Sequence, residues 1–367
     1  MTPIEFRRHL HAHPELSFAE QETAHLIEEQ LAAAAIPTRR IASTGVLATI
    51  EGRGDRHRAV VLRADIDALP ITELSEVAWR SQNTGVMHAC GHDMHAAVLY
   101  GVLLHLAATR DFEGTIFGLF QPGEECNPGG ASLVLAENPF EGYQIEAVIG
   151  EHVEPQLAVG TLGFRAGKYM AANDELRLKV QGRGGHAALR GELHDPVGAA
   201  AQLITELLAL NTEECVLSIG KVEAAGATNV IPDNVSLEGT LRTFDEENRK
   251  NTKEKIETLA AQIDRQHQTH TLVDINTGYP CVVNDAALTE QATHLAAQQA
   301  LGIEMLPLRT TAEDFGYYGT RYPSLFYRLG VGTAAGRTHT AQFNPDEGAI
   351  NIGIAFMETL AVKILNR

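Results

Sequence analysis

The sequence predicts an α/β protein that carries a second, inserted α+β domain. In the first 170 residues and again from residue 279, short apolar runs alternate with helix-length patterns. Between them, strand-length runs alternate polar and apolar residues, as half-solvated strands do. A chain of 367 residues is also longer than one hydrophobic core usually supports. We therefore expect a catalytic domain over 1–170 and 279–367, and an inserted domain over 171–278.

The first part of the chain contains the expected core of the α/β domain. A capping-box pattern, Ser17 followed by Glu20, predicts the start of the first helix. Short buried strands that alternate with helices are typical of a mixed, largely parallel sheet with helices on both faces. The expected helices are 17–36 and 92–109, and the expected strands are 45–51, 59–67, 115–120 and 147–150.

The middle of the chain has the order β-α-β-β-α-β, which is typical of two helices packed on one antiparallel sheet. Its expected strands are 174–180, 215–222, 234–244 and 271–275, and its expected helices are 195–210 and 246–266. The chain then returns to the α/β pattern. Expected there are helices over 286–301 and 347–365 and a strand over 324–329.

Charge and cysteine content narrow the classes of partner. The net charge of −18 argues against nucleic acid or an anionic membrane. The four cysteines form no CxxC pair, so we expect neither a disulfide framework nor a zinc ribbon. The sequence shows no signal peptide and no apolar run that we judge long enough to span a bilayer. A reducing cytoplasm is the expected compartment.

The densest chemical signal is the run from His88 to His95, HACGHDMH. Within it, the Cys90 thiolate and the His92 imidazole are ligands of borderline-soft divalent metals, and the one-residue gap lets both reach one ion from a turn. Alone, such a pair is more often a histidine-rich helix start with a buried cysteine.

Further candidate ligands follow other expected strands. Glu124 and Glu125 come directly after one, where one carboxylate can bind metal while its neighbour moves protons. His152 ends another apolar run, and His339 follows a third. Ligands bind at the carboxyl ends of strands in open α/β sheets. The five candidates suit two metal ions better than one, and they are Cys90, His92, Glu125, His152 and His339.

The inserted domain offers His186 after two glycines, Asn229 before a turn, and Arg242. Glycines let the backbone approach a ligand closely, and arginine can hold a carboxylate with two hydrogen bonds. From pattern alone, Arg242 reads as an ordinary solvated strand position.

Taken together, these motifs resemble the M20 metallopeptidases, and within them the aminoacylase, hippurate hydrolase and auxin-conjugate hydrolase group. The likeness spans the whole chain, and its blocks are RHLHAHPEL at 8–16, RADIDALP at 63–70, the Cys90 block, QPGEE at 121–125, Gly185-His186, NVIPD at 229–233, AEDF at 312–315, and His339 with Phe343-Asn344. Relatives usually have leucine where this chain has Glu151, and a Pro-His pair after Gly185-His186, where this chain has 187–191, AALRG.

The resemblance implies a zinc-peptidase-like catalytic domain with a ferredoxin-like lid that also dimerises. It implies the same five metal ligands for two divalent ions per subunit, and Zn, Mn, Co and Ni all remain open. Glu124 would be the general base, and Asp65 would support the metal site from behind. His186, Asn229 and Arg242 would contact the substrate, and the lid histidine can serve the partner subunit.

The implied reaction is hydrolysis of the amide bond of N-acyl amino acids, such as acetyl or benzoyl conjugates, or of short peptides. Two alternatives stay open. One is a dipeptidase or aminopeptidase of the same superfamily. The other is a non-catalytic metal-binding relative, which a missing base or ligand would favour. The acyl group and the amino acid are not decided by the sequence.

Overall fold

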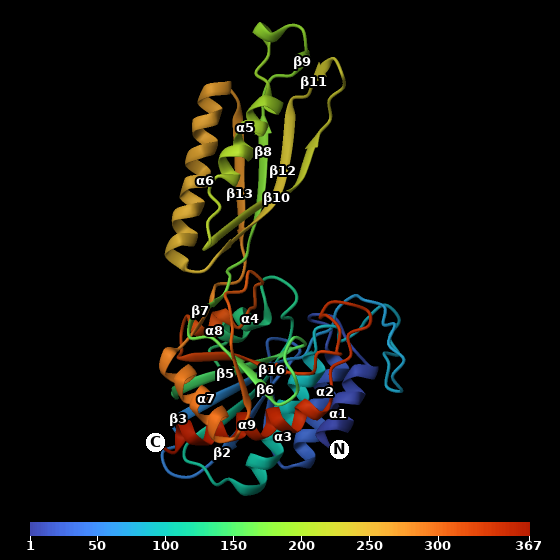
Figure 1. Ribbon diagram of the computed structural model, residues 1–367, viewed down its shortest axis with the longest axis vertical. Coiled ribbons are helices and arrows are strands. Elements are labelled where there is room, and N and C mark those ends of the chain that lie inside the picture. Colours follow the sequence, from blue (N-terminus) through green and yellow to red (C-terminus); the bar gives the residue numbers. More distant parts are fainter. The chain divides into compact units, whose positions relative to one another are not determined.

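A computed structural model describes the whole chain, from Met1 to Arg367, as two compact units (Figure 1). Unit 1 comprises Met1–Gly167, Val283–Pro307 and Asp314–Arg367, and unit 2 comprises Lys168–Val282 and Leu308–Glu313. These limits lie within a few residues of the expected domain boundaries. The short segment Leu308–Glu313 had no counterpart in the expected division, because it is too short to carry a periodic pattern.

Unit 1 is built on an eight-stranded mixed sheet with the order β1-β2-β4-β3-β5-β16-β6-β15. The pairs β3/β4, β3/β5, β5/β16 and β6/β15 are parallel, and the other three are antiparallel. The predicted mixed α/β sheet is therefore confirmed. In chain order the strands are β1 (Thr38–Ile41), β2 (Gly45–Glu51), β3 (Arg58–Asp65), β4 (Thr115–Gln121), β5 (Gln144–Glu154), β6 (Thr161–Phe164), β15 (Gly302–Met305) and β16 (Ser324–Gly330).

Helices cover both faces of this sheet, because its central strands are buried on both sides. Along β3, Val60 and Leu62 join the core under α3 and α9, whereas Val61 and Arg63 point to the opposite face. The helices of unit 1 are α1 (Pro3–Ala12), α2 (Gln21–Ala33), α3 (His92–Thr109), α4 (Gly130–Ala136), α7 (Ala286–Gln298), α8 (Gly316–Gly319) and α9 (Gly348–Leu365).

The start of the chain differs from the expectation. The capping box is formed by Thr2 and Glu5 at the start of α1, a helix that the sequence reading missed. Ser17 caps nothing, since its hydroxyl donates to Asp67 Oδ2 at 2.7 Å, and α2 begins only at Gln21. The Ser17 pattern was misleading because a short hydroxyl side chain can bond a distant carboxylate instead of a nearby backbone N–H.

Helix α9 corrects a second expectation. By length and composition it is apolar enough to cross a membrane, so the chain does contain such a run. In the structure it is a core helix, and its buried residues include Ile354, Phe356 and Leu360. It packs against α3 and β3.

Unit 2 has the predicted order β-α-β-β-α-β, folded as a four-stranded antiparallel sheet with the order β10-β12-β8-β13. A small pair, β9 (Gly185–His186) and β11 (Val230–Ile231), lies beyond the end of this sheet. The main elements are β8 (Asp174–Gln181), α5 (Pro196–Leu208), β10 (Cys215–Ala224), β12 (Asn234–Thr243), α6 (Glu246–His267) and β13 (His270–Thr277). Where the chain passes between the units, β7 (Gly167–Met170) pairs with β14 (Val282–Asn284).

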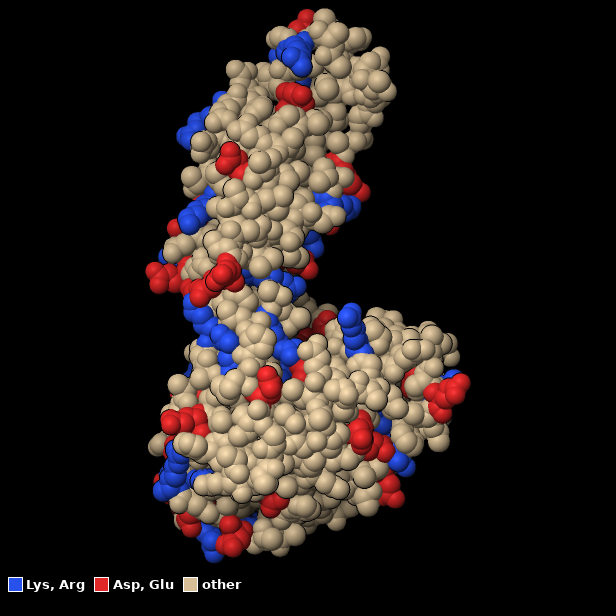
Figure 2. Space-filling model, in the orientation of Figure 1, with Lys and Arg blue, Asp and Glu red and all other residues tan.

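Surface charge is mixed in sign on the face shown in Figure 2. Acidic and basic side chains are interspersed there among neutral ones, and no continuous basic band covers either unit on that face.

Candidate metal centre

Four neighbouring strands of unit 1 bring the candidate residues to one edge of the sheet. The strands β4, β3, β5 and β16 are adjacent and mutually parallel, so their carboxyl ends meet. Asp65 ends β3, the Glu124-Glu125 pair follows β4, and His152 lies near the end of β5. His339 lies in the loop that follows β16. This is the edge at which ligands bind in open α/β sheets.

The turn before α3 presents Cys90 and His92 to the same edge. Gly91, between them, has φ of +92°, and a Cβ there would lie 2.6 Å from Val153 Cγ2. Only glycine fits this turn without strain. His92 is the first residue of α3, so the helix start fixes its side chain.

The five predicted ligands converge. The Sγ of Cys90 lies 3.3 Å from Nε2 of His152 and 3.3 Å from Nε2 of His339. Oε1 of Glu125 lies 3.2 Å from Nε2 of His339 and 3.9 Å from Nε2 of His92. Two groups of three therefore share the Cys90 sulfur: Cys90, His92 and His152, and Cys90, Glu125 and His339.

Two atoms in this cluster lack the hydrogen bonds that buried polar atoms normally have. Nε2 of His92 and Oε1 of Glu125 are both buried and face each other, and neither makes a hydrogen bond of normal geometry, although Oε1 lies 3.2 Å from Nε2 of His339. Leaving such atoms unsatisfied is unfavourable, so each one calls for an explanation. Divalent cations satisfy an imidazole lone pair and a carboxylate oxygen together, and the donor set of thiolate, imidazole and carboxylate fits them.

The other ring nitrogens of two candidate ligands, His92 and His152, are held as metal sites require. Nδ1 of His92 lies 2.9 Å from the Asp67 carbonyl oxygen, and Nδ1 of His152 lies 2.7 Å from the Val153 carbonyl oxygen. Both therefore donate from Nδ1, which leaves the Nε2 lone pair for a cation. Burial raises the pKa of the Cys90 thiol to about 12, so its sulfur needs a cation nearby to be held as a thiolate.

Asp65 lies behind these ligands. Its Oδ1 is 2.6 Å from Nδ1 of His95 and its Oδ2 is 2.6 Å from Nη1 of Arg63. His95 Nε2 accepts the Val153 N–H at 2.9 Å, so both His95 nitrogens are engaged and His95 is not available as a ligand. Arg63 is fully buried and also binds Asp314 at 2.8 Å, which ties β3 to a distant part of the chain.

Asp67 belongs to the RADIDALP block at 63–70, and the sequence alone assigned it no role. Its Oδ1 lies 3.1 Å from Nδ1 of His92, and its Oδ2 accepts the Glu125 backbone N–H at 3.0 Å. It therefore orients two candidate ligands, whereas Asp65 reaches His92 only at 3.8 Å. The available signal was the Asp-x-Asp pattern at a strand end, since alternate residues share one face.

Glu124 lies beside the cluster, with Oε2 4.0 Å from Nε2 of His92, and its side chain is 8% exposed. Pro122-Gly123 turns the chain after β4, and Gly123 has φ of +59°. The turn thus presents Glu124 and Glu125 to the same cluster.

Glu151, at the position where the resemblance implies leucine, takes no part in the cluster. The Tyr327 hydroxyl donates to its Oε2 at 2.9 Å within the core. Burial raises the pKa of Glu151 to about 8, so its carboxyl is protonated at neutral pH. The departure alters the core beside His152 and removes no ligand.

The three predicted residues of unit 2 do not lie together. His186 and Asn229 are adjacent at the β9/β11 end, where the Ala187 N–H donates to the Asn229 carbonyl at 3.0 Å. Arg242 lies near the opposite end of β12, roughly 26 Å from Asn234 at ~3.3 Å per residue. The Ala188 N–H donates to Nδ1 of His186 at 3.2 Å, so the His186 proton is on Nε2 and can be donated.

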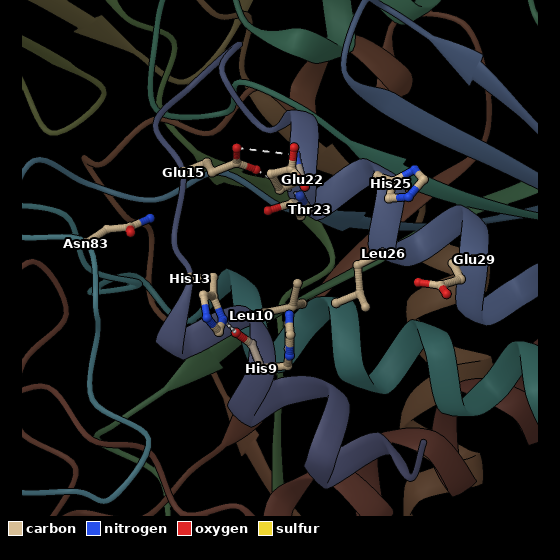
Figure 3. A pocket seen from close by; sticks show the side chains of 10 residues that line it. All are labelled: His9, Leu10, His13, Glu15, Glu22, Thr23, His25, Leu26, Glu29 and Asn83. Atoms are coloured by element: carbon tan, nitrogen blue, oxygen red, sulfur yellow. Dashed lines mark hydrogen bonds between the residues drawn. The ribbon is translucent and has the colours of Figure 1, made fainter.

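A separate cavity of about 390 Å³ lies between α1 and α2 and contains none of the candidate ligands (Figure 3). Its polar groups already serve the fold. Glu15 accepts the N–H groups of Glu22 and Thr23 and so caps α2, and Nδ1 of His13 lies 2.9 Å from the His9 carbonyl oxygen.

A family profile and similar known proteins all indicate the same family. The sequence profile described as Peptidase family M20/M25/M40 matches residues 61–363. An N-acetyl-L-cysteine deacetylase of Bacillus subtilis (strain 168) is 39% identical, with 99% of this chain and 88% of that protein aligned. An N-acetyldiaminopimelate deacetylase of Priestia megaterium is 33% identical, with 96% of both chains aligned.

Two solved structures match over nearly the whole chain. One is described as a putative aminohydrolase from methicillin-resistant Staphylococcus aureus, with a TM-score of 0.92, 33% identity, and coverage of 99% of this chain and 96% of that one. The other is a Bacillus subtilis protein described as a dinuclear metal binding peptidase from the M20 family. It has a TM-score of 0.89, 34% identity, and coverage of 99% and 97%.

Proposed function

The chain belongs to peptidase family M20/M25/M40, and we propose that it hydrolyses the amide bond of N-acyl amino acids at a centre for two divalent metal ions. The observation that carries the proposal is the convergence of five side chains around two unsatisfied buried atoms, Nε2 of His92 and Oε1 of Glu125. The names of the aligned relatives, deacetylases of N-acetyl amino acids, support the substrate class.

Two groups of ligands that share Cys90 favour two ions over one. The ions would be held by Cys90, His92, Glu125, His152 and His339. The chemistry that such ions supply is a water acidic enough to lose a proton near neutral pH and a polarised substrate carbonyl. Zn, Mn, Co and Ni all fit this donor set.

Glu124 is suited to the role of general base. It neighbours the Glu125 ligand in sequence, and its carboxylate lies close to His92. In the proposed mechanism it takes a proton from the attacking water and returns it to the leaving amine. Such a group typically contributes about 10²–10⁴ in rate.

His186, Asn229 and Arg242 are the proposed substrate contacts. His186 Nε2–H would donate to the carbonyl oxygen as charge develops there, and Arg242 and Asn229 would bind the α-carboxylate. Because β12 separates Arg242 from His186 and Asn229, one lid cannot bring all three to one amino-acid-sized substrate. We therefore propose a homodimer in which two lids contribute to each site.

Small N-acyl amino acids or short peptides are the proposed partners, rather than nucleic acid or membrane, in view of the net charge of −18. The cytoplasm is the proposed compartment. All four cysteines are free, which suits a reducing environment.

A substrate panel tests the proposal. Protein reconstituted separately with Zn²⁺, Mn²⁺, Co²⁺ and Ni²⁺ would be assayed on N-acetyl and N-benzoyl amino acids and on the matching free-amine dipeptides. We expect kcat/KM for acyl amino acids to exceed that for dipeptides. The reverse order would favour the peptidase alternative, and no turnover with any metal would favour a non-catalytic relative.

A further inference from the structure

A buried cluster of charged side chains on α1 lies outside the proposed metal centre. Arg7 is 0% exposed and lies beside His11 of the same helix, and these two residues contact Asp93, Glu73 and Glu347, which come from three other parts of the chain. We call these five residues the α1 charge cluster. The proposed reaction uses none of them.

Arg7 joins two of these parts directly. Its Nε lies 2.7 Å from Oδ2 of Asp93, and its Nη1 lies 3.2 Å from Oε1 of Glu347. Asp93 follows the candidate ligand His92 in the first turn of α3. Glu347 precedes α9 and ends the loop 331–347, which carries His339. One buried guanidinium therefore connects the start of α3 with the His339 loop.

His11 joins a third part. Its Nδ1 lies 2.8 Å from Oδ2 of Asp93, and its Nε2 lies 3.1 Å from Oε1 of Glu73. Glu73 belongs to the loop 70–86. The residue after it, Leu74, donates its backbone N–H to the Ala341 carbonyl oxygen at 2.7 Å. The loop 70–86 thus connects the α1 charge cluster to a residue two positions from His339.

His339 is the ligand that most needs such support. Its side chain is 52% exposed, whereas the Glu125 side chain is 14% exposed and Cys90 is 7% exposed. Its φ of +61° is a strained backbone conformation for a residue other than glycine, and it persists only where the surroundings impose it. One backbone bond, from the His339 N–H to the Ala89 carbonyl at 2.7 Å, holds the residue itself.

We propose that Arg7 is a positioning residue that holds the His339 loop against the start of α3 and so completes the His339 side of the metal centre. The proposal rests on the proposed function for the presence of two metal ions. It assigns a role to Arg7, directly before the RHLHAHPEL block, and to His11 within it, which metal ligation and substrate binding do not use.

The test compares Arg7→Gln, Arg7→Lys and Glu347→Gln with the control Arg58→Gln. Arg58 pairs with Glu146 at 2.8 Å in the same unit, but neither residue contacts the α1 charge cluster. Glu347 has a side chain that is 14% exposed and also pairs with Arg8 at 2.6 Å, so its substitution removes the Arg7 and Arg8 contacts together, whereas the Arg7 variants remove the Arg7 contacts alone. The variant Arg7→Gln/Glu347→Gln shows whether the two residues act as a unit.

The first measurement uses metal-free protein and hydrogen exchange. We expect the amides of His339 and Leu74 to exchange at least about tenfold faster in Arg7→Gln and Glu347→Gln, with amides of β3 unchanged. Arg58→Gln should match the wild type. Unchanged exchange at His339 and Leu74 in both variants would overturn the proposal, whatever the protein does with metal.

The second measurement is a Co²⁺ titration followed by absorption, in which the thiolate-to-metal band reports Cys90. We expect the weaker of two binding steps to lose about 10–100-fold in affinity in both single variants, as removal of outer-shell support typically does. Arg7→Lys should recover part of the loss, and the double variant should be no weaker than the weaker single one. If the single variants bind Co²⁺ with the same affinity as the wild type at each of the two steps, the proposal is overturned. A wild type that binds fewer than two Co²⁺ ions would instead contradict the proposed function.

Discussion

Asp65 Oδ1 lies 2.6 Å from His95 Nδ1, and both side chains are fully buried. The Val153 N–H donates to the opposite ring nitrogen of His95, so His95 must donate its Nδ1 proton to Asp65. Arg63 holds the second Asp65 oxygen. This chain of contacts supports the candidate metal centre from behind, through polar atoms that are already engaged with one another.

Asp65→Asn tests that support. The amide keeps the shape but removes the charge that faces Arg63, His92 and His95, so the ligands should be held less firmly. We expect a 10–100-fold loss of affinity for at least one metal ion, the range typical for outer-shell partners. Competition with a chelator measures it, with the exposed Asp111→Asn as control. If Asp65→Asn binds metal with wild-type affinity, Asp65 does not support the metal centre.

Glu124→Gln tests the general base. The variant should keep its metal content, because Glu124 is not among the proposed ligands, and lose about 10²–10⁴ in kcat. Metal analysis and steady-state rates on one sample make the comparison, with the exposed Glu141→Gln as control. Retention of more than a tenth of the wild-type rate would exclude Glu124 as the base.

Much of the architecture could be predicted from local patterns. The strand Gly45–Glu51 and the helix His92–Thr109 have the expected limits, because each has a continuous apolar pattern between clear boundaries. Helix α1 was missed because it is short and contains Arg7, Arg8, His9 and His11, which hide its amphipathic pattern. Arg7 and His11 are buried only because Asp93 and Glu73 arrive from elsewhere.

Prediction of the candidate site is limited in the same way, because some roles depend on contacts between distant parts of the chain. Residue type, the one-residue gap between Cys90 and His92, and position after a strand for the others were enough to select the five converging side chains. The role of Asp67 depends on its distances to His92 and to the Glu125 N–H, which no spacing along the chain specifies. The separation of Arg242 from His186 likewise follows from the register of β12, and sequence proximity gives no sign of it.

Mixing two inactive variants tests whether lids serve partner subunits. A heterodimer of His186→Ala and Glu124→Gln chains contains one intact site only if His186 acts across the dimer. Random exchange of subunits should therefore restore about a quarter of wild-type activity, since half of the dimers carry one good site. Each variant alone, at the same concentration, is the control. If the mixture stays inactive although mass spectrometry detects heterodimers, His186 acts within its own subunit.

The stability of unit 2 should depend on pH through the charge of the Asp174 carboxylate. Burial raises the pKa of this carboxyl, but ion pairs with Arg249 at 2.7 Å and Lys253 at 3.0 Å outweigh burial and lower it below its usual 3.8. A lowered folded-state pKa gives stability that is present above pH 3.8 and is lost as pH falls through the folded value. Asp174→Asn should therefore destabilise unit 2 by roughly 3–5 kcal/mol at pH 7.

That difference should shrink as the pH falls below 3.8 toward the lowered pKa of the folded Asp174 carboxyl, where the wild-type carboxylate gains a proton and loses its charge. Hydrogen exchange of β8 and α6 amides at pH 7 and pH 3, corrected for intrinsic rates, measures it. A difference between variant and wild type that is equal at both pH values would contradict the assigned role of the Asp174 charge.

Anomalous diffraction from crystals grown with Zn²⁺ or Mn²⁺, recorded at the metal edge, tests the two-metal centre itself. We expect two peaks per chain, both within bonding distance of atoms from Cys90, His92, Glu125, His152 and His339. Peaks elsewhere, or no peak among these five side chains in protein that hydrolyses N-acyl amino acids, would contradict this expectation.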